Sequence, residues 1–271
     1  MPSLPAPLRH RRRWIVILAR LGYTAKGVVY LLIGILAALG AVGLGGDNVG
    51  TKEALAHLAR QPFGSLMLAA LVAGLYAYAA WRGLQGLFDV ENRGRSLKAL
   101  GTRAALVISG LIYASLGWYG LELLDDPHET TGGAEERTAM LMSHPGGLWL
   151  VAALGLIFIG VGVRQSWRAL TASYLERWRR QDMSKRQKDL ASGLSRWGLA
   201  ARGVVFALIG GFLLAAAWQA DPGQAEGLGG ALDALAAQPF GPWWLAAVAG
   251  GLLNYGTYCV INARFRQVKV D

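Results

Sequence analysis

Six long apolar stretches alternate with short polar segments along the chain, and most of the charged residues lie in the polar segments. The hydrocarbon core of a bilayer is about 30 Å thick, so a helix that crosses it needs roughly 20 mainly apolar residues. Each stretch is close to that length or longer. The pattern predicts six membrane-spanning helices, near Gly27–Gly45, Phe63–Phe88, Ala104–Leu124, Gly147–Leu170, Gly203–Ala220 and Gly241–Ala263.

A shorter pattern occurs three times: an arginine, a glycine, an aromatic residue and a second glycine, separated by seven, three and four positions. At about 3.6 residues per turn these positions share one helix face. Glycine lets two helices approach closely and a ring fills the next layer, so we interpret the face as a helix-packing seam. Its copies are Arg20, Gly27, Tyr30, Gly34; Arg103, Gly110, Tyr113, Gly117; and Arg196, Gly203, Phe206, Gly210.

A proline precedes the second apolar stretch of each copy, at Pro62, Pro145 and Pro239. Proline suits the first turn of a helix, where its missing N–H is not needed, so we expect it there. Between seam and proline lie short segments such as Glu53–Arg60 and Ala231–Ala237. Their leucine spacing predicts short helices at the outer membrane interface, with the apolar side toward lipid.

The predicted fold is therefore all-α: a polytopic integral membrane protein of six transmembrane helices, arranged as three tandem two-helix repeats. Each repeat crosses twice, so all three enter the membrane in one orientation, and either a pseudo-three-fold bundle or an open row of hairpins would accommodate them. The expected parts are a basic arm at 1–13, repeat 1 at 14–90, repeat 2 at 97–170, a basic connection at 171–190 and repeat 3 at 191–265.

Composition and charge agree with a membrane location. Hydrophobic residues make up 54% of the chain and charged residues 16%, and the mean hydropathy is +0.34. Of the 27 Lys and Arg, all but Lys52, Arg60 and Arg137 fall on one predicted side. By the positive-inside rule that side is cytoplasmic, which predicts a bacterial inner (plasma) membrane protein with both termini in the cytoplasm.

The beginning of the chain, with basic residues at 9–13 before an apolar run, has some features of a cleaved signal peptide. Arg20 and Lys26 interrupt that run and no small-residue cleavage site follows, so we expect an uncleaved first helix. The lone cysteine, Cys259, excludes an intramolecular disulfide.

Three short runs, Leu18–Tyr23 (LARLGY), Lys26–Tyr30 (KGVVY) and Ala59–Gly64 (ARQPFG), resemble the domain of unknown function 1206 family. That resemblance implies a bacterial membrane protein with three tandem copies of a two-helix domain, and it implies no reaction, ligand or catalytic residue. The second copy departs from the pattern. It has His144 and Gly146 in place of Gln and Phe, and it lacks the glycine and tyrosine found at Gly74 and Tyr78, and again at Gly251 and Tyr255.

Basic residues near the start of each first helix are the main candidates for a site: Arg20, Lys26, Arg103, Arg196 and Arg202. Three arginines around an axis would bind an anion or a lipid headgroup, and a cation on the inner face of a bundle often marks a substrate path. The alternative is that these side chains extend to the headgroups and set the topology.

The basic connection Thr171–Ser195 mixes cations with Tyr174, Leu175, Trp178 and Met183. This mixture suits a helix lying on anionic lipid, and a solvated loop is the alternative.

No catalytic fingerprint occurs, and the histidines have no recognised metal-ligand spacing, so we predict neither an enzyme nor a metal or cofactor site. Nucleic-acid binding is not expected, because the basic and aromatic residues are explained by the membrane. The leading hypothesis is a non-enzymatic bundle that associates with lipids, anionic at the cytoplasmic face, or with a partner membrane protein or further copies of itself. The alternative is a small transporter or channel that uses Arg20, Arg103 and Arg196.

Overall fold

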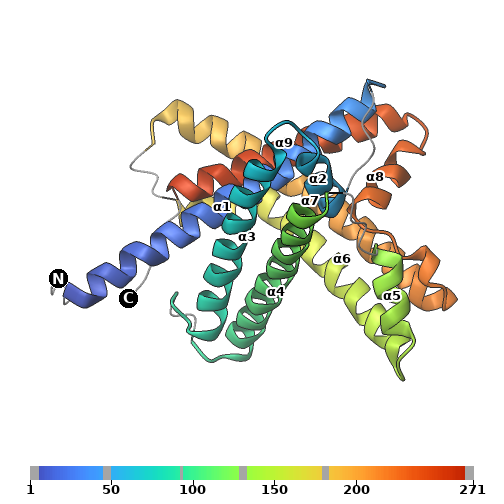
Figure 1. The fold of residues 1–271 in the computed structure, drawn as a ribbon, viewed down its shortest axis with the longest axis horizontal. Helices are drawn as coiled ribbons and strands as arrows, with labels where there is room; N and C mark the ends of the chain where they lie inside the picture. The colour runs from blue at the N-terminus through green and yellow to red at the C-terminus, as the bar shows by residue number, and fades with distance from the viewer. Residues whose placement is uncertain (1–5, 45–49, 92–93, 128–132, 179–182, 266–271) are drawn as a thin grey trace.

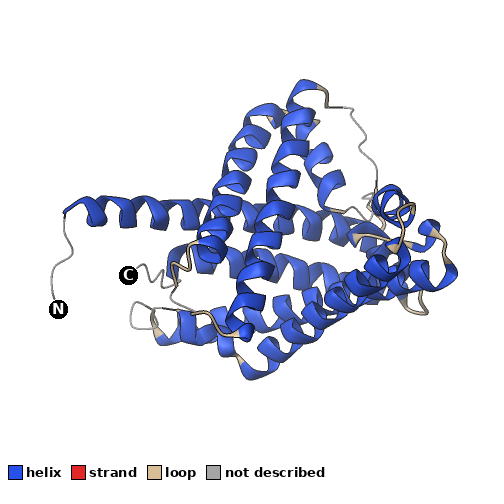
Figure 2. Ribbon diagram, turned by 90° about the horizontal axis from the view of Figure 1, so that it is seen from below, coloured by secondary structure: helices blue, strands red, loops and turns tan. Residues whose placement is uncertain are grey.

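The computed structural model describes residues 6–44, 50–91, 94–127, 133–178 and 183–265, and these contain helices and loops but no strand (Figure 2). The helices are α1 (Ala6–Ala41), α2 (Thr51–Ala59), α3 (Gly64–Leu87), α4 (Leu97–Asp125), α5 (Ala134–Met142), α6 (Gly147–Thr171), η1 (Ser173–Arg177), α7 (Lys185–Gln219), η3 (Pro222–Gln224), α8 (Leu228–Ala236) and α9 (Gly241–Phe265).

Six of these helices, α1, α3, α4, α6, α7 and α9, are long and apolar enough to cross a membrane, which confirms the predicted number of spans. The first helix of repeats 1 and 3 is longer than predicted, because α1 continues back to Ala6 and α7 back to Lys185. Hydropathy alone missed these extensions because they contain Arg and Lys. Both residues have high helix propensity and extend the helix beyond its apolar stretch.

Each repeat packs its second helix on the first helix of the next repeat. The pairs are α3 with α4, α6 with α7 and α9 with α1 (Figure 1). The α9–α1 contact joins the third repeat back to the first, so the repeats do not form an open row of hairpins.

The contacts between the two helices of one repeat differ among the three repeats, unlike the contacts between repeats. In repeat 1, α1 packs on α3, and in repeat 3, α7 packs on α9. Within the described part of the chain, α4 and α6 of repeat 2 form no comparable contact, and their ribbons diverge toward the bottom of Figure 1.

The seam glycines lie where the helices of neighbouring repeats meet. A Cβ placed on Gly27 would lie 3.0 Å from a backbone oxygen of α9, on Gly110 3.1 Å from one of α3, and on Gly203 3.0 Å from one of α6. The three oxygens belong to Gly256, Ala79 and Gly162. Glycine therefore brings backbones into direct contact at the same place in each inter-repeat pair.

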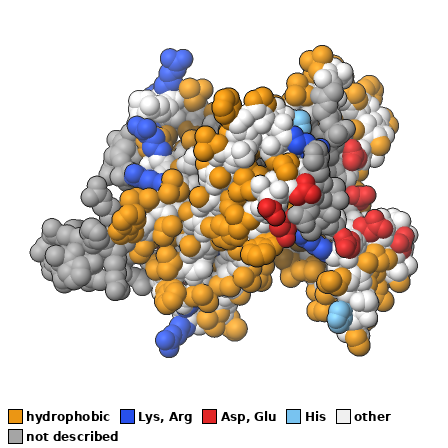
Figure 3. Space-filling view, in the orientation of Figure 1, with side chains coloured by type: hydrophobic (Ala, Val, Ile, Leu, Met, Phe, Trp, Pro, Cys, Tyr) orange, Lys and Arg blue, Asp and Glu red, His pale blue; other side chains and the backbone are white. Residues whose placement is uncertain are grey.

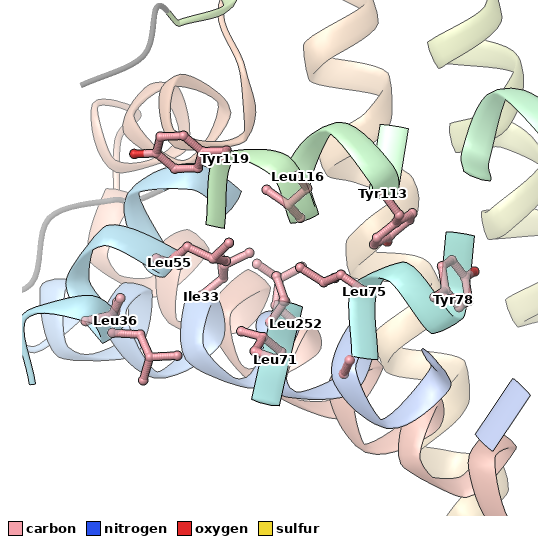
Figure 4. Close-up of a cluster of buried hydrophobic side chains, with 14 of the residues drawn as sticks. Ile33, Leu36, Leu55, Leu71, Leu75, Tyr78, Tyr113, Leu116, Tyr119 and Leu252 are labelled. Atoms are coloured by element: carbon pink, nitrogen blue, oxygen red, sulfur yellow. The ribbon is translucent and has the colours of Figure 1, made fainter. Parts of the chain in front are cut away.

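The short helices α2 and α8 direct their leucines into the bundle. Leu55 of α2 and Leu232 of α8 are fully buried in the main core, together with Ile33, Leu75 and Leu252 of the spans (Figure 4). The expectation that the apolar side faces lipid was wrong. Helix α2 packs on α1, α3 and α4, and α8 packs on α7 and α9, so the leucines of the short helices face the bundle.

The three prolines lie before their helices rather than in the first turn, which corrects the expected position. α3, α6 and α9 begin two residues after Pro62, Pro145 and Pro239. The intervening residue has positive φ in each case, at Phe63, Gly146 and Phe240. The amides of Gly64, Gly147 and Gly241 each donate to the carbonyl oxygen three residues earlier. Proline second and positive φ third are the marks of a type II turn.

In the described part of the basic connection, residues 171–178 and 183–195, three of the apolar side chains face the protein rather than lipid or solvent. Tyr174, Trp178 and Met183 are buried against the end of α9, where Trp178 Nε1 donates to Asn262 Oδ1 at 3.2 Å. Tyr174 donates its hydroxyl to the carbonyl oxygen of Ser192 at 2.8 Å, and burial raises the pKa of this phenol, which keeps the donor protonated. Both expectations, a helix on lipid and a solvated loop, failed for these side chains because the sequence does not show that α6, α7 and α9 leave an apolar recess at this end.

We expect Gly64→Ala to destabilise the protein strongly, because its Cβ would overlap the carbonyl oxygens of Leu58 and Ala59 in the turn before α3. The matched control is Gly83→Ala in the same helix, where a Cβ meets nothing within 4 Å. Thermal unfolding in mild detergent should show a large loss for the first variant and a change of no more than about 1 kcal/mol for the second. Equal effects would contradict the turn geometry.

Candidate functional site

Charge divides the molecule into two ends. Most Lys and Arg visible in Figure 3 lie at the left, where the α3–α4 and α6–α7 connections are found, and the Asp and Glu lie at the right, beside α2, α5 and α8. We call these the basic end and the acidic end. Two groups of arginines lie toward the basic end, and they differ in what they contact.

The first group binds helix termini. Arg103 donates from Nε and Nη2 to the carbonyl oxygens of Gly86 and Leu87, both at 2.8 Å. Arg196 repeats this contact with Ala169 and Leu170, at 3.0 and 2.9 Å. Each arginine thus caps the carbonyl end of the helix before it, where the helix dipole favours a cation.

The second group surrounds Lys26, whose side chain is only 5% exposed. Its Nζ donates to Tyr78 Oη at 3.2 Å. The same nitrogen lies 5.1 Å from the ring centroids of Tyr78 and Tyr113, 5.6 Å from that of Tyr255 and 6.0 Å from that of Tyr30. Four tyrosines from α1, α3, α4 and α9 therefore surround one ammonium group. Contacts of this kind attract a cation to the ring faces.

Two half-buried arginines share these tyrosines. Arg82 of α3 donates from Nε to Tyr78 Oη at 2.8 Å, makes a second contact with that oxygen through Nη2, and donates from Nη1 to Gln85 Oε1 at 3.0 Å. Arg202 of α7 donates to Tyr30 Oη at 3.0 Å, and its guanidinium lies 4.7 Å from the Tyr255 ring centroid. We call Lys26, Arg82, Arg202 and the four tyrosines the cation cage.

Nothing acidic balances the cation cage. Among the described residues, no carboxylate pairs with Lys26, Arg82 or Arg202, and the buried polar residues include no Asp or Glu. One neutral oxygen, Tyr78 Oη, receives donors from both Lys26 and Arg82. Close by along α3, the fully buried Gln85 Nε2 and Trp81 Nε1 have no acceptor in the described part of the chain. The site therefore has more donors than acceptors and more positive than negative charge.

An apolar layer separates the cage from the acidic end. Ile33, Leu75 and Leu252 are fully buried beyond Tyr78 and Tyr113, and Leu55 of α2 lies over them (Figure 4). These side chains close the centre of the bundle on the acidic side.

The structure separates the five predicted cations. It brings Lys26 and Arg202 together in the cage, and it places Arg103 and Arg196 at the ends of two different helices. Arg20 is exposed on α1. None of the three arginines of the proposed ring, Arg20, Arg103 and Arg196, belongs to the cage, and two of them are bound to helix ends.

Sequence reasoning missed Arg82 as a site residue, although a signal was present. Arg82 lies inside the second predicted span, Phe63–Phe88, and the charge count included it only as one of the cations on the predicted cytoplasmic side. Tyr78 lies one turn before it, and residues four apart share a helix face. A Tyr–Arg pair inside an apolar stretch would have identified α3 as a wall of the site.

The seam aromatics form one ring contact in each inter-repeat pair. Tyr30 meets Tyr255 at a centroid distance of 4.7 Å, Tyr113 meets Tyr78 at 4.6 Å, and Phe206 meets Phe158 at 5.4 Å. Only the first two pairs carry hydroxyls, so the polar part of the cage is built by repeats 1 and 3 and by α4. Across the described residues, no group of three His, Cys, Asp or Glu is placed to hold a metal ion.

A model of the Domain of Unknown Function (DUF1206) matches the chain three times, at residues 21–89, 104–172 and 197–266. The chain belongs to this family. It is a multi-pass membrane protein of three tandem DUF1206 copies, as the resemblance in the sequence implied. The cation cage combines residues from all three copies.

The chain is also similar to the uncharacterized protein YxxB of Bacillus subtilis (strain 168). The two are 34% identical over 257 residues, which cover 94% of this chain and 92% of that protein. No solved structure matches the chain.

We expect Arg103→Gln and Arg196→Gln each to lower the free energy of unfolding by about 1 kcal/mol, because each removes two charged hydrogen bonds to helix carbonyls. Arg95→Gln, at an exposed position of the α3–α4 connection, is the matched control and should change little. Chemical or thermal unfolding in detergent measures both. Unchanged stability in the first two variants would show that these contacts do not cap the helices.

Proposed function

We propose that this protein is a non-enzymatic membrane protein that binds an anionic group, a phosphate or a carboxylate, in the cation cage. The observation that carries the proposal is the set of three cations for which the described part of the chain supplies no carboxylate partner. The proposal keeps the association with anionic ligands that the sequence suggested, and moves its site from the repeated arginines to Lys26, Arg82 and Arg202.

The energetic argument rests on the cost of unbalanced charge inside a membrane. A Lys or Arg costs about 2.5–3.5 kcal/mol at the centre of a spanning helix on insertion scales, and this is an upper bound for the cage cations, which lie nearer the basic end. The tyrosine rings and hydroxyls offset part of this cost, but they carry no net negative charge. An oxyanion would balance the charge and accept several of the surplus donors, and guanidinium groups match its geometry.

Binding explains the geometry better than conduction. A channel needs a continuous polar path, whereas the layer of Ile33, Leu75 and Leu252 separates the cage from the acidic end. The proposed site is therefore a group of cations closed on the acidic side, rather than part of a continuous pore.

We place the protein in the bacterial plasma membrane, with the basic end and both termini in the cytoplasm, on the strength of the charge asymmetry. In this orientation the cage lies in the half of the bilayer that faces the cytoplasm.

Thiol labelling tests the orientation. Glu135→Cys on α5 should react with a membrane-impermeant maleimide in intact cells, whereas Lys185→Cys at the start of α7 should react only after permeabilisation. Both positions are exposed, and the native Cys259 is buried and serves as the background control. The reverse pattern would show that the basic end lies outside.

Thermal unfolding tests the binding site, because a ligand that binds only the folded state stabilises it by about 2.7 kcal/mol at 100 times its Kd. Inorganic phosphate and soluble dihexanoyl phosphatidic acid are the probes. We expect at least one of them to raise the Tm of the wild-type protein. Lys26→Met and Arg202→Met should lose this shift.

The ligand-free Lys26→Met protein should be more stable than wild type by an amount on the order of 1 kcal/mol, because one of three like charges is removed. The matched control is Arg168→Gln, since Arg168 bonds to Gln165 and Tyr258 much as Arg82 bonds to Gln85 and Tyr78, but lies outside the cage. It should keep the wild-type Tm shift. If neither probe shifts the wild type, the proposed function is wrong.

A further inference from the structure

Repeats 1 and 3 hold their two helices together through small residues. In repeat 1, Gly22 lies against the backbone of Tyr78, and Ala25 touches Gly74. In repeat 3 the same positions make the same contacts, Gly198 against Tyr255 and Ala201 against Gly251. No larger side chain fits at either crossing, because backbone and Cβ atoms are already in contact.

Repeat 2 carries larger side chains at the corresponding positions. Positions in the first helix are matched by their distance from the seam arginine, and those in the second helix by their distance from the helix start. On this count Ala105 stands where repeat 1 has Gly22, and Val161 stands where it has Tyr78. Ile108 and Ile157 stand where repeat 1 has Ala25 and Gly74. Two β-branched isoleucines cannot occupy the space of an alanine and a glycine. The separation of α4 and α6 therefore follows from these substitutions, and Ile108 and Ile157 remain 57% and 59% exposed.

The two helices that carry the unpartnered isoleucines also carry aromatic residues that lie near the cation cage. On α4, Tyr113 lies one to two turns after Ile108, and its ring is one of the four around Lys26. On α6, Phe158 follows Ile157 and stacks against Phe206, whose ring centroid lies 4.2 Å from the Arg202 guanidinium. At about 3.6 residues per turn, Tyr113 lies about 140° around α4 from Ile108, and Phe158 lies about 100° around α6 from Ile157. Helix α4 therefore reaches Lys26, and α6 reaches Phe206 beside Arg202, from faces other than the unpartnered ones.

The cage also lies at a depth that a lipid headgroup can reach. Arg103 marks the basic end of α3 by binding the carbonyl oxygens of Gly86 and Leu87. Arg82 is four residues earlier on that helix, which is about 6 Å deeper at about 1.5 Å per residue. On α7, Arg202 is six residues after the capping Arg196, which is about 9 Å at the same rise. The cations are therefore between one and two helical turns below the capping arginines.

We infer that the anionic group is the headgroup phosphate of a two-chain phospholipid from the leaflet at the basic end, and that this lipid reaches the cage between α4 and α6. Its acyl chains lie on the faces of Ile108, Ile157 and Val161, and its phosphate accepts hydrogen bonds from Lys26, Arg82 and Arg202. The inference rests on the proposed function and adds the class of ligand and its route.

A second copy of the chain could cover these apolar faces, but it would not balance the charge of the cage. Within the six spans the acids are Glu122, Asp125 and Asp189, all near helix ends, so another copy offers no carboxylate at the depth of the cage. An anionic phospholipid supplies both requirements, because its chains cover the apolar faces and its phosphate balances the charge.

A bulky residue at the entrance tests the route. Ile157→Trp places an indole between α4 and α6, whereas Leu156→Trp places it on the adjacent, 62% exposed position of the same helix and serves as the matched control. Each protein is reconstituted into vesicles of equal parts phosphatidylglycerol and phosphatidylethanolamine and extracted in mild detergent. Bound lipids are then counted by native mass spectrometry.

We expect the wild type and Leu156→Trp to retain a single phosphatidylglycerol, and Ile157→Trp and Lys26→Met to retain at least about five-fold less, equivalent to about 1 kcal/mol of lost binding. Ile157→Trp should still show the wild-type Tm shift with whichever soluble probe, inorganic phosphate or dihexanoyl phosphatidic acid, stabilises the wild type. Loss of phosphatidylglycerol together with an unchanged Tm shift would show that Ile157→Trp blocks the entry of lipid and leaves the anion-binding site intact.

Three outcomes would overturn the inference. Wild-type retention of phosphatidylglycerol by Ile157→Trp would show that lipid does not enter between α4 and α6. A preference for phosphatidylethanolamine, or a dimer with no lipid, would show that another occupant covers these faces. Each of these leaves the proposed function standing if a soluble probe still binds, whereas loss of all probe binding in the wild type removes both.

Discussion

Close approach of helix backbones is the constraint on which the rest of this structure depends. Inside a membrane, apolar side chains gain little by leaving lipid for another helix, so helices associate where small residues allow many short contacts. Gly27, Gly110 and Gly203 provide such contacts between repeats. They determine that each repeat binds the next one, and that the third binds the first.

The same constraint, applied inside each repeat, distinguishes the second copy from the others. The Ala25–Gly74 and Ala201–Gly251 crossings close repeats 1 and 3. Ile108 and Ile157 keep repeat 2 open. One pair of substitutions thus gives an arrangement with three-fold inter-repeat contacts a distinct side, and α4, which borders this side, contributes Tyr113 to the cation cage.

The cage also depends on sequence differences among the three copies. Lys26 and Arg202 occupy equivalent positions in the first helices of repeats 1 and 3, whereas repeat 2 has Ser109 there. Tyr78 and Tyr255 are likewise equivalent, and Val161 replaces them in repeat 2. Repeats 1 and 3, in which the two helices are in contact, supply the cations and three of the tyrosines. Repeat 2 supplies Tyr113 from α4 and an apolar face on α6. A site with a polar interior and one apolar side suits an amphiphilic anion.

The sequence by itself determined the six spans, the three copies and the charge asymmetry, because these depend on hydropathy, spacing and composition along the chain. It also named Lys26 and Arg202 as candidate site residues, although it placed both of them just before their spans rather than inside the helices. It misplaced the leucines of α2 and α8, the aromatic residues of the α6–α7 connection and the three prolines, since the surfaces they meet belong to distant segments.

Only the tertiary structure decided which cations share a site, because Lys26, Arg82 and Arg202 come from α1, α3 and α7 and meet through tyrosines of four helices. Periodicity shows which residues share a face of one helix. Which faces then meet depends on how closely each pair of backbones can approach, and that is a property of two segments together.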